Sequence, residues 1–276
     1  MAAPCEVRLD SYDKALAESI GHIAETEALR IERKFSHSRA DNVVAEINGA
    51  AGAPVRVDDE TADLLDYAEA CWRLSKGRFD ITCGVLRRVW RFDGSDQVPR
   101  RRQVRELMPF VGWGKVLWRR PHLTLRPGME IDLGGLDKEY AVDSALGLVR
   151  RETRAPVLIR FGGDVGVTGP RAGFGRWRIA VEPADESAAA DTTLEISVGA
   201  VTTSGDARRF LLRDGVRYGH VLDPRTGWAV KDAPRSVSVA ADTCMEAGLI
   251  STLAMLQGRN AEKFLRREGV RAWWVR

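Results

Sequence analysis

The chain has 276 residues, of which 44% are hydrophobic and 29% are charged, and its formal net charge is +3. This composition is typical of a globular protein and excludes a disordered chain, a collagen-like chain and a coiled coil. At about 150 residues per domain, the length fits one large domain or two packed lobes. The one dense basic run, residues 100–105, is interpreted as a solvated loop or helix start, so we expect no nucleic-acid partner.

Cysteines and histidines are few and scattered, with four of each. No two cysteines have the CxxC spacing of a zinc or redox site, and no two histidines form an HxxxH pair. Each cysteine lies among apolar residues, so we expect four buried thiols: Cys5, Cys71, Cys83 and Cys244. No segment approaches the roughly 18 consecutive apolar residues of a membrane span, and residues 1–10 do not resemble a secretory leader.

The first half of the chain is mainly helical. Residues 2–9 are predicted to form a strand, and apolar residues recur at helical spacing over 12–34. A second helix is predicted over 59–75, with Asp58 or Asp59 as its N-cap. Residues 123–135 are predicted to form a strand, a turn and a second strand that ends in a glycine pair, and a helix follows over 138–150.

The second half is rich in strands. β-Branched and aromatic residues predict strands over 157–161, 177–181, 194–198, 236–241 and 270–275. Helices are predicted over 245–256 and 260–268, and residues 182–192 form a loop rich in Ala, Glu and Asp. Because helices and strands alternate irregularly, the sequence favours a layered α+β fold over a strict βαβ series.

Four short motifs could carry chemistry. Gly162, Gly163 and Asp164 follow the strand over 157–161, where glycines allow backbone amides to approach an anion. Asp132 precedes a glycine pair and a helix start, an arrangement that suits a phosphate. Residues 204–206 (Ser-Gly-Asp) end a strand, and His220 precedes a Pro-Gly turn. Each motif alone is also explained as a structural turn.

Taken together and in order, these motifs resemble the FAD:protein FMN transferase family, the ApbE-like proteins. The matching segments, which span nearly the whole chain, are EALRIERKFS…IN (27–48), GRFDITCGVLRRVWRF (77–92), GMEIDLGGLDKEYAVD (128–143), IRFGGDVGVTG (159–169), TSGDARRF…HVLDPRTG (203–227) and SVSVAADTCMEAGLISTLAML (236–256).

The resemblance implies one ApbE-like FAD-binding domain over residues 1–276. Its α+β fold would consist of two packed lobes, with mixed or antiparallel sheets flanked by helices and the flavin nucleotide between the lobes. The implied reaction is a metal-dependent transfer of FMN from FAD to a Thr or Ser hydroxyl of a partner flavoprotein, with release of AMP and with Mg²⁺ as the metal. Since the sequence has no leader or lipidation cysteine, it resembles the cytoplasmic members.

The resemblance also implies residue roles. His220 would handle the proton of the incoming hydroxyl, and Asp206 would assist it. Gly135 would offer its carbonyl and Thr252 its hydroxyl to the metal. The flavin nucleotide would be bound by Met1, Ser38, Arg78, Phe79, Asp80, Asp132, Lys138, Gly163, Asp164 and Ser204.

Three positions depart from the family pattern. Gly248 stands where the family motif Ala-Asp-Ala-x-x-Thr has its metal-binding Asp, a loss that should weaken Mg²⁺ binding. Asp137 and Glu139 are unusual acids nearby, and either Asp137 or Glu246 is interpreted as the replacement ligand. Ser38 replaces a Tyr that would stack on the flavin, and Arg78 replaces a small residue.

The departures leave other functions open. The chain could be a flavin-binding module that transfers nothing, because its metal site has lost a ligand. A hydrolase that splits FAD to FMN and AMP, with water in place of the acceptor, is a variant of the transferase. An unrelated α+β protein, in which the motifs are structural turns, is the remaining alternative.

Overall fold

A computed structural model describes residues 4–173, 175–180, 193–207 and 209–276. Its centre is a six-stranded sheet in which every neighbouring pair is antiparallel. In spatial order the strands are β1 (Cys5–Leu9), β5 (Val157–Phe161), β6 (Asp164–Val167), β9 (Gly199–Gly205), β14 (Ser236–Ala241) and β15 (Arg271–Val275). The two ends of the chain therefore form the two edges of the same sheet.

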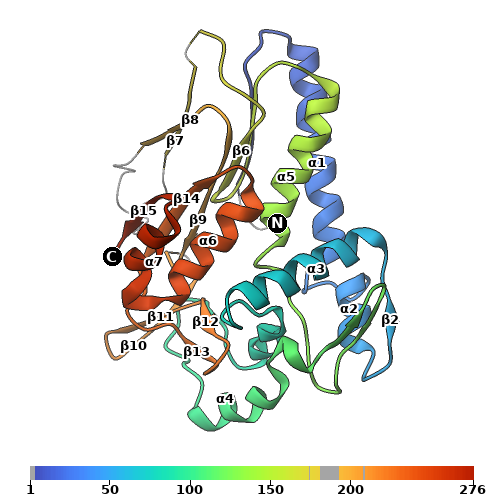
Figure 1. The fold of residues 1–276 in the computed structure, drawn as a ribbon, viewed down its shortest axis with the longest axis vertical. Helices are drawn as coiled ribbons and strands as arrows, with labels where there is room; N and C mark the ends of the chain where they lie inside the picture. Colours follow the sequence, from blue (N-terminus) through green and yellow to red (C-terminus); the bar gives the residue numbers. More distant parts are fainter. Residues whose placement is uncertain (1–3, 174, 181–192, 208) are drawn as a thin grey trace.

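Helices cover one face of this sheet (Figure 1). They are α1 (Lys14–Phe35), α5 (Asp137–Glu152), α6 (Cys244–Leu256) and α7 (Ala261–Glu268). Alternate residues of β5 explain the layering. Ile159 and Phe161 belong to the core beneath the helices, whereas Leu158 faces the other side. There the hairpin of β7 (Trp177–Ala180) and β8 (Thr193–Ile196) packs on the sheet.

Shorter elements build a second lobe beside the sheet and its helices, at the bottom of Figure 1. The helical elements are α2 (Val43–Gly49), α3 (Asp59–Leu74) and α4 (Arg101–Leu107), with 3-10 turns η1 (Ile81–Arg88), η2 (Met108–Phe110) and η3 (Trp113–Lys115). A small sheet contains β2 (Val55–Arg56), β4 (His122–Thr124) and β3 (Leu117–Arg119).

Further short elements lie between β9 and α7 in the sequence. They are the pairs β10 (Phe210–Arg213) with β11 (Val216–Gly219) and β12 (Leu222–Asp223) with β13 (Trp228–Ala229), and the 3-10 turn η4 (Gly258–Asn260).

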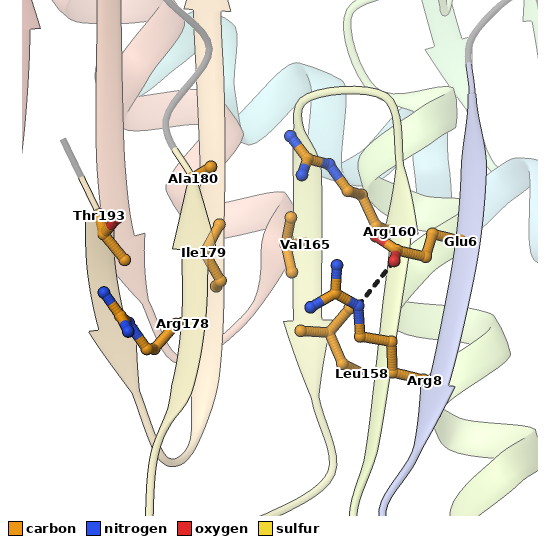
Figure 2. A pocket seen from close by; sticks show the side chains of 9 residues that line it. All are labelled: Glu6, Arg8, Leu158, Arg160, Val165, Arg178, Ile179, Ala180 and Thr193. Atoms are coloured by element: carbon orange, nitrogen blue, oxygen red, sulfur yellow. Dashed lines mark hydrogen bonds and ion pairs between the residues drawn. The ribbon is translucent and has the colours of Figure 1, made fainter. Parts of the chain in front are cut away.

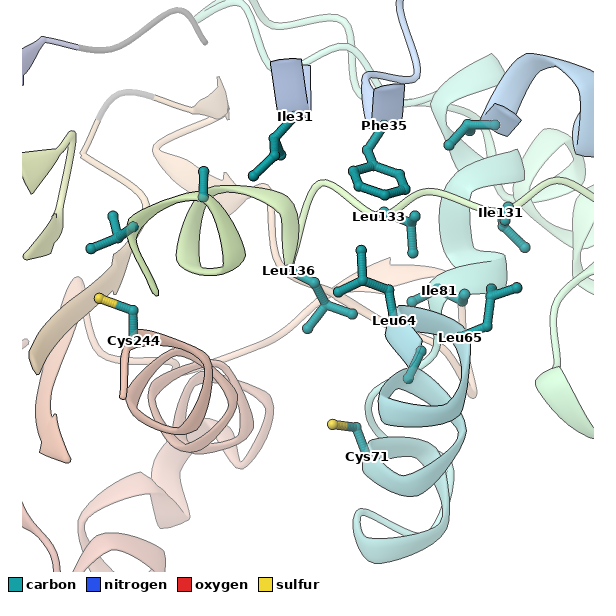
Figure 3. Close-up of a cluster of buried hydrophobic side chains, with 14 of the residues drawn as sticks. Ile31, Phe35, Leu64, Leu65, Cys71, Ile81, Ile131, Leu133, Leu136 and Cys244 are labelled. Carbon is teal, nitrogen blue, oxygen red and sulfur yellow. The ribbon is translucent and has the colours of Figure 1, made fainter. Parts of the chain in front are cut away.

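One hydrophobic core joins the two lobes. Figure 3 shows Phe35 of α1, Leu64 of α3 and Leu136 just before α5 facing a common centre. Leu65 and Ile131 extend this cluster and are almost fully buried. Because residues from both lobes share a continuous core, the lobes support each other through hydrophobic burial.

The sequence predicted most of these elements well. The α+β class is confirmed, and the strands over 157–161 and 236–241 have the predicted bounds. Helix α1 begins after Asp13, whose side chain accepts a hydrogen bond from the Leu16 amide, and α3 is capped in the same way by Asp58. The basic run near residue 100 opens α4, as predicted.

Two expectations were wrong. The second strand predicted within 123–135 does not form, because Asn48 takes the place of a neighbouring strand: its side chain bonds both the amide and the carbonyl of Ile131, at 2.8 and 3.0 Å. Cys5 is exposed on the edge strand β1, and Cys83 is half-buried, so only Cys71 and Cys244 are buried thiols.

Candidate functional site

An ion pair between a half-buried lysine and a buried aspartate lies where α5 begins against the central sheet. Lys138, in the first turn of α5, places its Nζ 2.8 Å from Oδ2 of Asp164, the first residue of β6. Asp164 is only 1% exposed. Burial acts to lower the pKa of Lys138, but the Asp164 and Glu139 carboxylates outweigh it and raise that pKa. Lys138 is therefore a fixed cation at a helix N-terminus, a position that favours anions.

The glycine pair before Asp164 forms a hairpin turn. Gly162 and Gly163 connect β5 to β6, and Gly162 has a φ of +64°, which glycine adopts without strain. A Cβ on Gly163 would lie 3.2 Å from the Thr203 carbonyl oxygen on β9. The motif therefore lets β6 turn tightly and brings its tip beside the end of β9.

Hydroxyl groups join the end of β9 to α6. Ser204 Oγ lies 2.7 Å from Ser251 Oγ and 3.1 Å from Thr252 Oγ1. The structure thus brings together Ser204 and Thr252, which the sequence placed in the nucleotide and metal sites. Gly135 is exposed just before α5, and a Cβ there would be 3.8 Å from the ring of Phe79.

His220 lies in the short loop between β11 and β12, where its backbone amide donates to the Arg209 carbonyl at 3.2 Å. Burial, assisted by the charge of Arg209, lowers the pKa of His220 to about 4. The charge of Asp206 opposes this lowering of the pKa, and the charge of Lys138 adds to it. Its Nδ1 is buried and has no hydrogen-bond partner among the described residues.

Asp206 is held by two arginines. Its Oδ2 lies 3.0 Å from Nε of Arg217, and its Oδ1 lies 2.9 Å from Nε of Arg235. Both carboxylate oxygens are thus engaged, and no hydrogen bond joins Asp206 to His220 in the described part of the chain. Asp206 is therefore positioned to hold the shape of the loop around His220 through its two arginine contacts.

Asp132 lies just before the other glycine pair, Gly134 and Gly135, and is held by several contacts. Its oxygens accept from Arg87 at 2.7 Å and from the Gly134 amide at 2.8 Å, and His37 Nδ1 lies 3.5 Å away. Although burial opposes it, the hydrogen bond from His37 and the charge of Arg87 lower the pKa of Asp132. Ser38 is exposed and bonds Ser36, so His37 is the side chain of this loop that reaches Asp132.

The segment 78–80 serves mainly as scaffold. Asp80 is buried and accepts from the amides of Thr82 and Trp113, at 2.9 and 2.8 Å. Phe79 packs beneath Gly135, and Arg78 lies 3.4 Å from the Leu256 carbonyl at the end of α6. The remaining predicted contact, Met1, lies outside the described residues.

Glu139 is the residue that the sequence reasoning underrated. Its side chain packs directly against Gly248, where an added Cβ would lie 2.8 Å from Glu139 Oε1. Glu246 is exposed, and Asp137 is half-buried with a pKa that burial raises to about 6. Of these three acids, Glu139 is thus the one whose carboxyl group contacts Gly248. Its departure from the family pattern was the available signal.

A cavity of about 340 Å³ opens elsewhere, between the sheet and the β7–β8 hairpin (Figure 2). Its lining is Glu6, Arg8, Leu158, Arg160, Val165, Arg178, Ile179, Ala180 and Thr193. None of the site residues predicted from the sequence lines it. Leu158 and Val165 belong to the core cluster under the hairpin, whereas Asp164 pairs with α5 on the opposite face. The cavity is therefore separate from the Lys138 site.

The described residues contain neither a cluster of metal-ligating side chains nor a membrane-spanning helix. No group of three His, Cys, Asp or Glu side chains is arranged to hold a metal ion there. No helix in this part of the chain is long and apolar enough to cross a membrane.

Comparisons with known proteins show which family and fold the chain matches. The family model described as the ApbE family matches residues 1–274. The FAD:protein FMN transferase of Klebsiella pneumoniae (strain 342) is 30% identical, with 95% of this chain and 81% of the relative covered. That of Chlamydia pneumoniae is 31% identical, covering 82% and 72%.

Solved structures show the same fold. The ApbE protein of Thermotoga maritima superposes with a TM-score of 0.87 at 32% identity, covering 97% of this chain and 88% of that one. The flavinyl transferase ApbE of Pseudomonas stutzeri gives a TM-score of 0.82 at 24% identity, covering 99% and 87%, and supports the fold alone.

Proposed function

This chain belongs to the ApbE family, and from that membership we propose that it is a transferase that moves FMN from FAD to a protein. Its relatives are named FAD:protein FMN transferases, and they match most of its length. In finer detail, the acceptor would be a Thr or Ser hydroxyl of a partner flavoprotein, and AMP would leave. We further propose that residues 1–276 act as one FAD-binding unit and that the location is cytoplasmic.

The observation that carries the proposal is the half-buried imidazole of His220, whose Nδ1 is buried and has no hydrogen-bond partner among the described residues. Burial lowers the pKa of His220, so the ring is neutral at neutral pH and has a nitrogen open to a proton. In the proposed step the acceptor oxygen bonds to the phosphorus on the FMN side of the FAD pyrophosphate. The bond from that phosphorus to the AMP oxygen breaks, AMP leaves, and the hydroxyl proton passes to His220.

Lys138 and the nearby glycines would bind the pyrophosphate. The Lys138 ammonium is held by Asp164, and the amides around Gly135 lie beside the N-terminus of α5. A fixed cation and a helix N-terminus both stabilise phosphate charge without having to reorganise during the reaction. The Ser204 hydroxyl at the end of β9 and the Thr252 hydroxyl on α6, which lie 3.1 Å apart, would offer neutral donors to the same group.

The residues present fit a divalent cation. Buried carboxylate oxygens of Asp164 and Glu139 have no hydrogen-bond partner among the described residues. With the Gly135 carbonyl and the Thr252 hydroxyl, they would provide oxygen ligands of the kind that Mg²⁺ prefers, and Mg²⁺ commonly uses one or two carboxylates plus substrate phosphates. When bound, the cation would neutralise charge on the pyrophosphate. Gly248 would contribute no side chain, and Asp137 is the acid next to Lys138 on α5.

The test is an assay of AMP and of covalent flavin. The purified protein is incubated with FAD, Mg²⁺ and an acceptor flavoprotein that carries a target Thr. Equal amounts of AMP and flavin-labelled acceptor would support the transferase. AMP without labelled acceptor would indicate hydrolysis, and tight FAD binding without AMP would indicate a binding module. Either result would overturn the proposal.

His220→Gln tests the proton acceptor. Because general-base catalysis typically contributes about 10²–10⁴-fold, we expect AMP release to slow by at least about a hundredfold, with FAD affinity almost unchanged. His122→Gln, at an exposed histidine of β4, is the matched control and should retain the wild-type rate. Equal rates for His220→Gln and His122→Gln would exclude the assigned role.

A further inference from the structure

Two carboxylate oxygens, one on α5 and one on β6, are buried without a hydrogen-bond partner among the described residues. Glu139 Oε2 and Asp164 Oδ1 are both buried and make no hydrogen bond within the described residues. Glu139 is 6% exposed and Asp164 is 1% exposed. Lys138 occupies only the other oxygen of Asp164, at 2.8 Å. Buried anionic oxygens are costly unless a cation or donor reaches them.

The local charge is also unbalanced. Asp137 and Glu139 flank Lys138 in the first turn of α5, and within the described residues the Lys138 ammonium bonds only Asp164. A bound cation would compensate the unpartnered carboxylate oxygens, because an ion is the largest charge in such a site.

The packing of α5 on α6 determines where Glu139 points. Asp143 accepts hydrogen bonds from the amides of Cys244 and Met245, both at 2.9 Å, so the middle of α5 caps the start of α6. Glu139 lies four residues before Asp143, and Gly248 lies four residues after Cys244. Residues four apart in a helix lie on the same face. This register therefore places the turn of α5 that carries Glu139 against the turn of α6 that carries Gly248.

Gly248 leaves the space that Glu139 fills. A Cβ at this position would be 2.6 Å from Glu139 Cγ and 2.8 Å from its Oε1, closer than packed atoms approach. The Gly248 carbonyl accepts from Ser251, whose hydroxyl bonds Ser204. The Glu139 carboxylate therefore extends from α5 into the volume that a side chain of α6 would otherwise take, toward the hydroxyl cluster.

We propose that Glu139 is the carboxylate ligand of a divalent cation at this site, reaching from α5 over Gly248, with Asp164 Oδ1 as the neighbouring anionic oxygen. The inference rests on the proposed function only for the cation's role in FMN transfer. It assigns to Glu139 the ligand position for which the sequence had suggested Asp137 or Glu246. Glu246 is exposed, so its carboxyl group lies outside this buried group.

The first experiment measures Mn²⁺ binding without FAD, by the loss of the free-ion electron paramagnetic resonance signal and by competition with Mg²⁺. Glu139→Gln keeps the shape of the side chain and removes its charge. Because a hard cation prefers carboxylate oxygen, we expect the Mn²⁺ dissociation constant to rise roughly tenfold or more, and the Mn²⁺-dependent rise in Tm to disappear. Unchanged Mn²⁺ affinity in Glu139→Gln would overturn the proposal.

A carboxylate exchange controls for misfolding. The double variant Glu139→Ala with Gly248→Asp moves the carboxylate from α5 to α6 across the same contact. We expect it to regain Mn²⁺ affinity to within about threefold of wild type, whereas Glu139→Ala alone stays weak. Glu246→Gln, at the exposed neighbour on α6, should bind Mn²⁺ like wild type. Loss of binding in Asp137→Asn but not in Glu139→Gln would refute the assignment.

The Mn²⁺-binding assay and the FMN-transfer assay test the two proposals separately. If Mn²⁺ binding depends on Glu139 but no AMP forms from FAD, the cation site stands and the transferase proposal falls. If AMP and labelled acceptor form while Glu139→Gln binds Mn²⁺ normally, the transferase stands and the Glu139 assignment falls.

Discussion

Glu60 ties three helices together, and its removal should weaken the fold at neutral pH. Its carboxylate on α3 accepts from Arg30 at 2.5 and 2.8 Å and from Lys34 at 2.6 Å, both on α1. Tyr140 of α5 donates to it at 2.9 Å. The substitution Glu60→Gln keeps the shape and the acceptor for Tyr140 but removes the charge that the two cations share.

The size of the effect follows from the pKa. The hydrogen bond from Arg30, opposed by burial and assisted by Lys34, lowers the pKa of Glu60 from 4.5 to about 2. That displacement corresponds to at most about 3 kcal/mol at neutral pH. Because Arg30 is 42% exposed, solvent screening reduces the expected contribution to about 1–2 kcal/mol.

The pH dependence has a definite sign. A carboxylate with a lowered folded-state pKa stabilises the protein fully above its unfolded value of 4.5, and this stabilisation is lost as the pH falls toward about 2. Urea unfolding of wild type and Glu60→Gln should therefore show the full difference at pH 7, and less than half of it at pH 3.

Glu18→Gln is the control for general charge effects. Glu18 lies 3.7 Å from Lys14 on the same helix, and both side chains are largely exposed. Such surface pairs contribute little, so this variant should unfold like wild type at both pH values. Equal stability of Glu60→Gln and wild type at pH 7, or a difference that persists undiminished at pH 3, would refute the electrostatic account.

Two further substitutions test the packing and the scaffold. Gly166→Ala on β6 would place a Cβ against Leu146 of α5, so we expect the free energy of unfolding, measured by thermal unfolding, to fall by about 1–3 kcal/mol. Gly147→Ala on α5 has open space around the added Cβ, so it should instead raise the free energy of unfolding by up to about 1 kcal/mol. Asp80→Ala would leave the buried Trp113 amide without its acceptor, which should lower the urea unfolding free energy by about 1–3 kcal/mol; an unchanged midpoint would contradict the scaffold role.

Local signals in the sequence explain the elements that it predicted. Asp58 and Asp13 act as caps through amides three residues away. The period of apolar residues along α1 is likewise a local signal that does not depend on the rest of the fold. The second strand predicted within 123–135 does not form, and the reason is a contact that is distant in the sequence. Asn48, more than 80 residues away, satisfies the Ile131 backbone and removes the need for a neighbouring strand.

The order of the motifs in the sequence was enough to indicate the family, and hence the α+β class and a flavin transferase. It did not reveal which predicted residues face one another. Asp80 turns inward to hold Trp113, and Ser38 stays at the surface while His37 approaches Asp132. Such orientations depend on packing between segments that lie far apart in the chain.

The contact between Glu139 and Gly248 shows most directly the difference between local sequence signals and packing between distant segments. The sequence by itself determined that α5 begins near Lys138, that α6 lacks a carboxylate at Gly248 and that unusual acids stand nearby. Only the tertiary structure decided which acid fills the gap, because the register between the helices is set by Asp143 capping α6 across about 100 residues of chain. Caps and periodicity are local interactions, whereas that register is fixed only when the helices pack on the sheet.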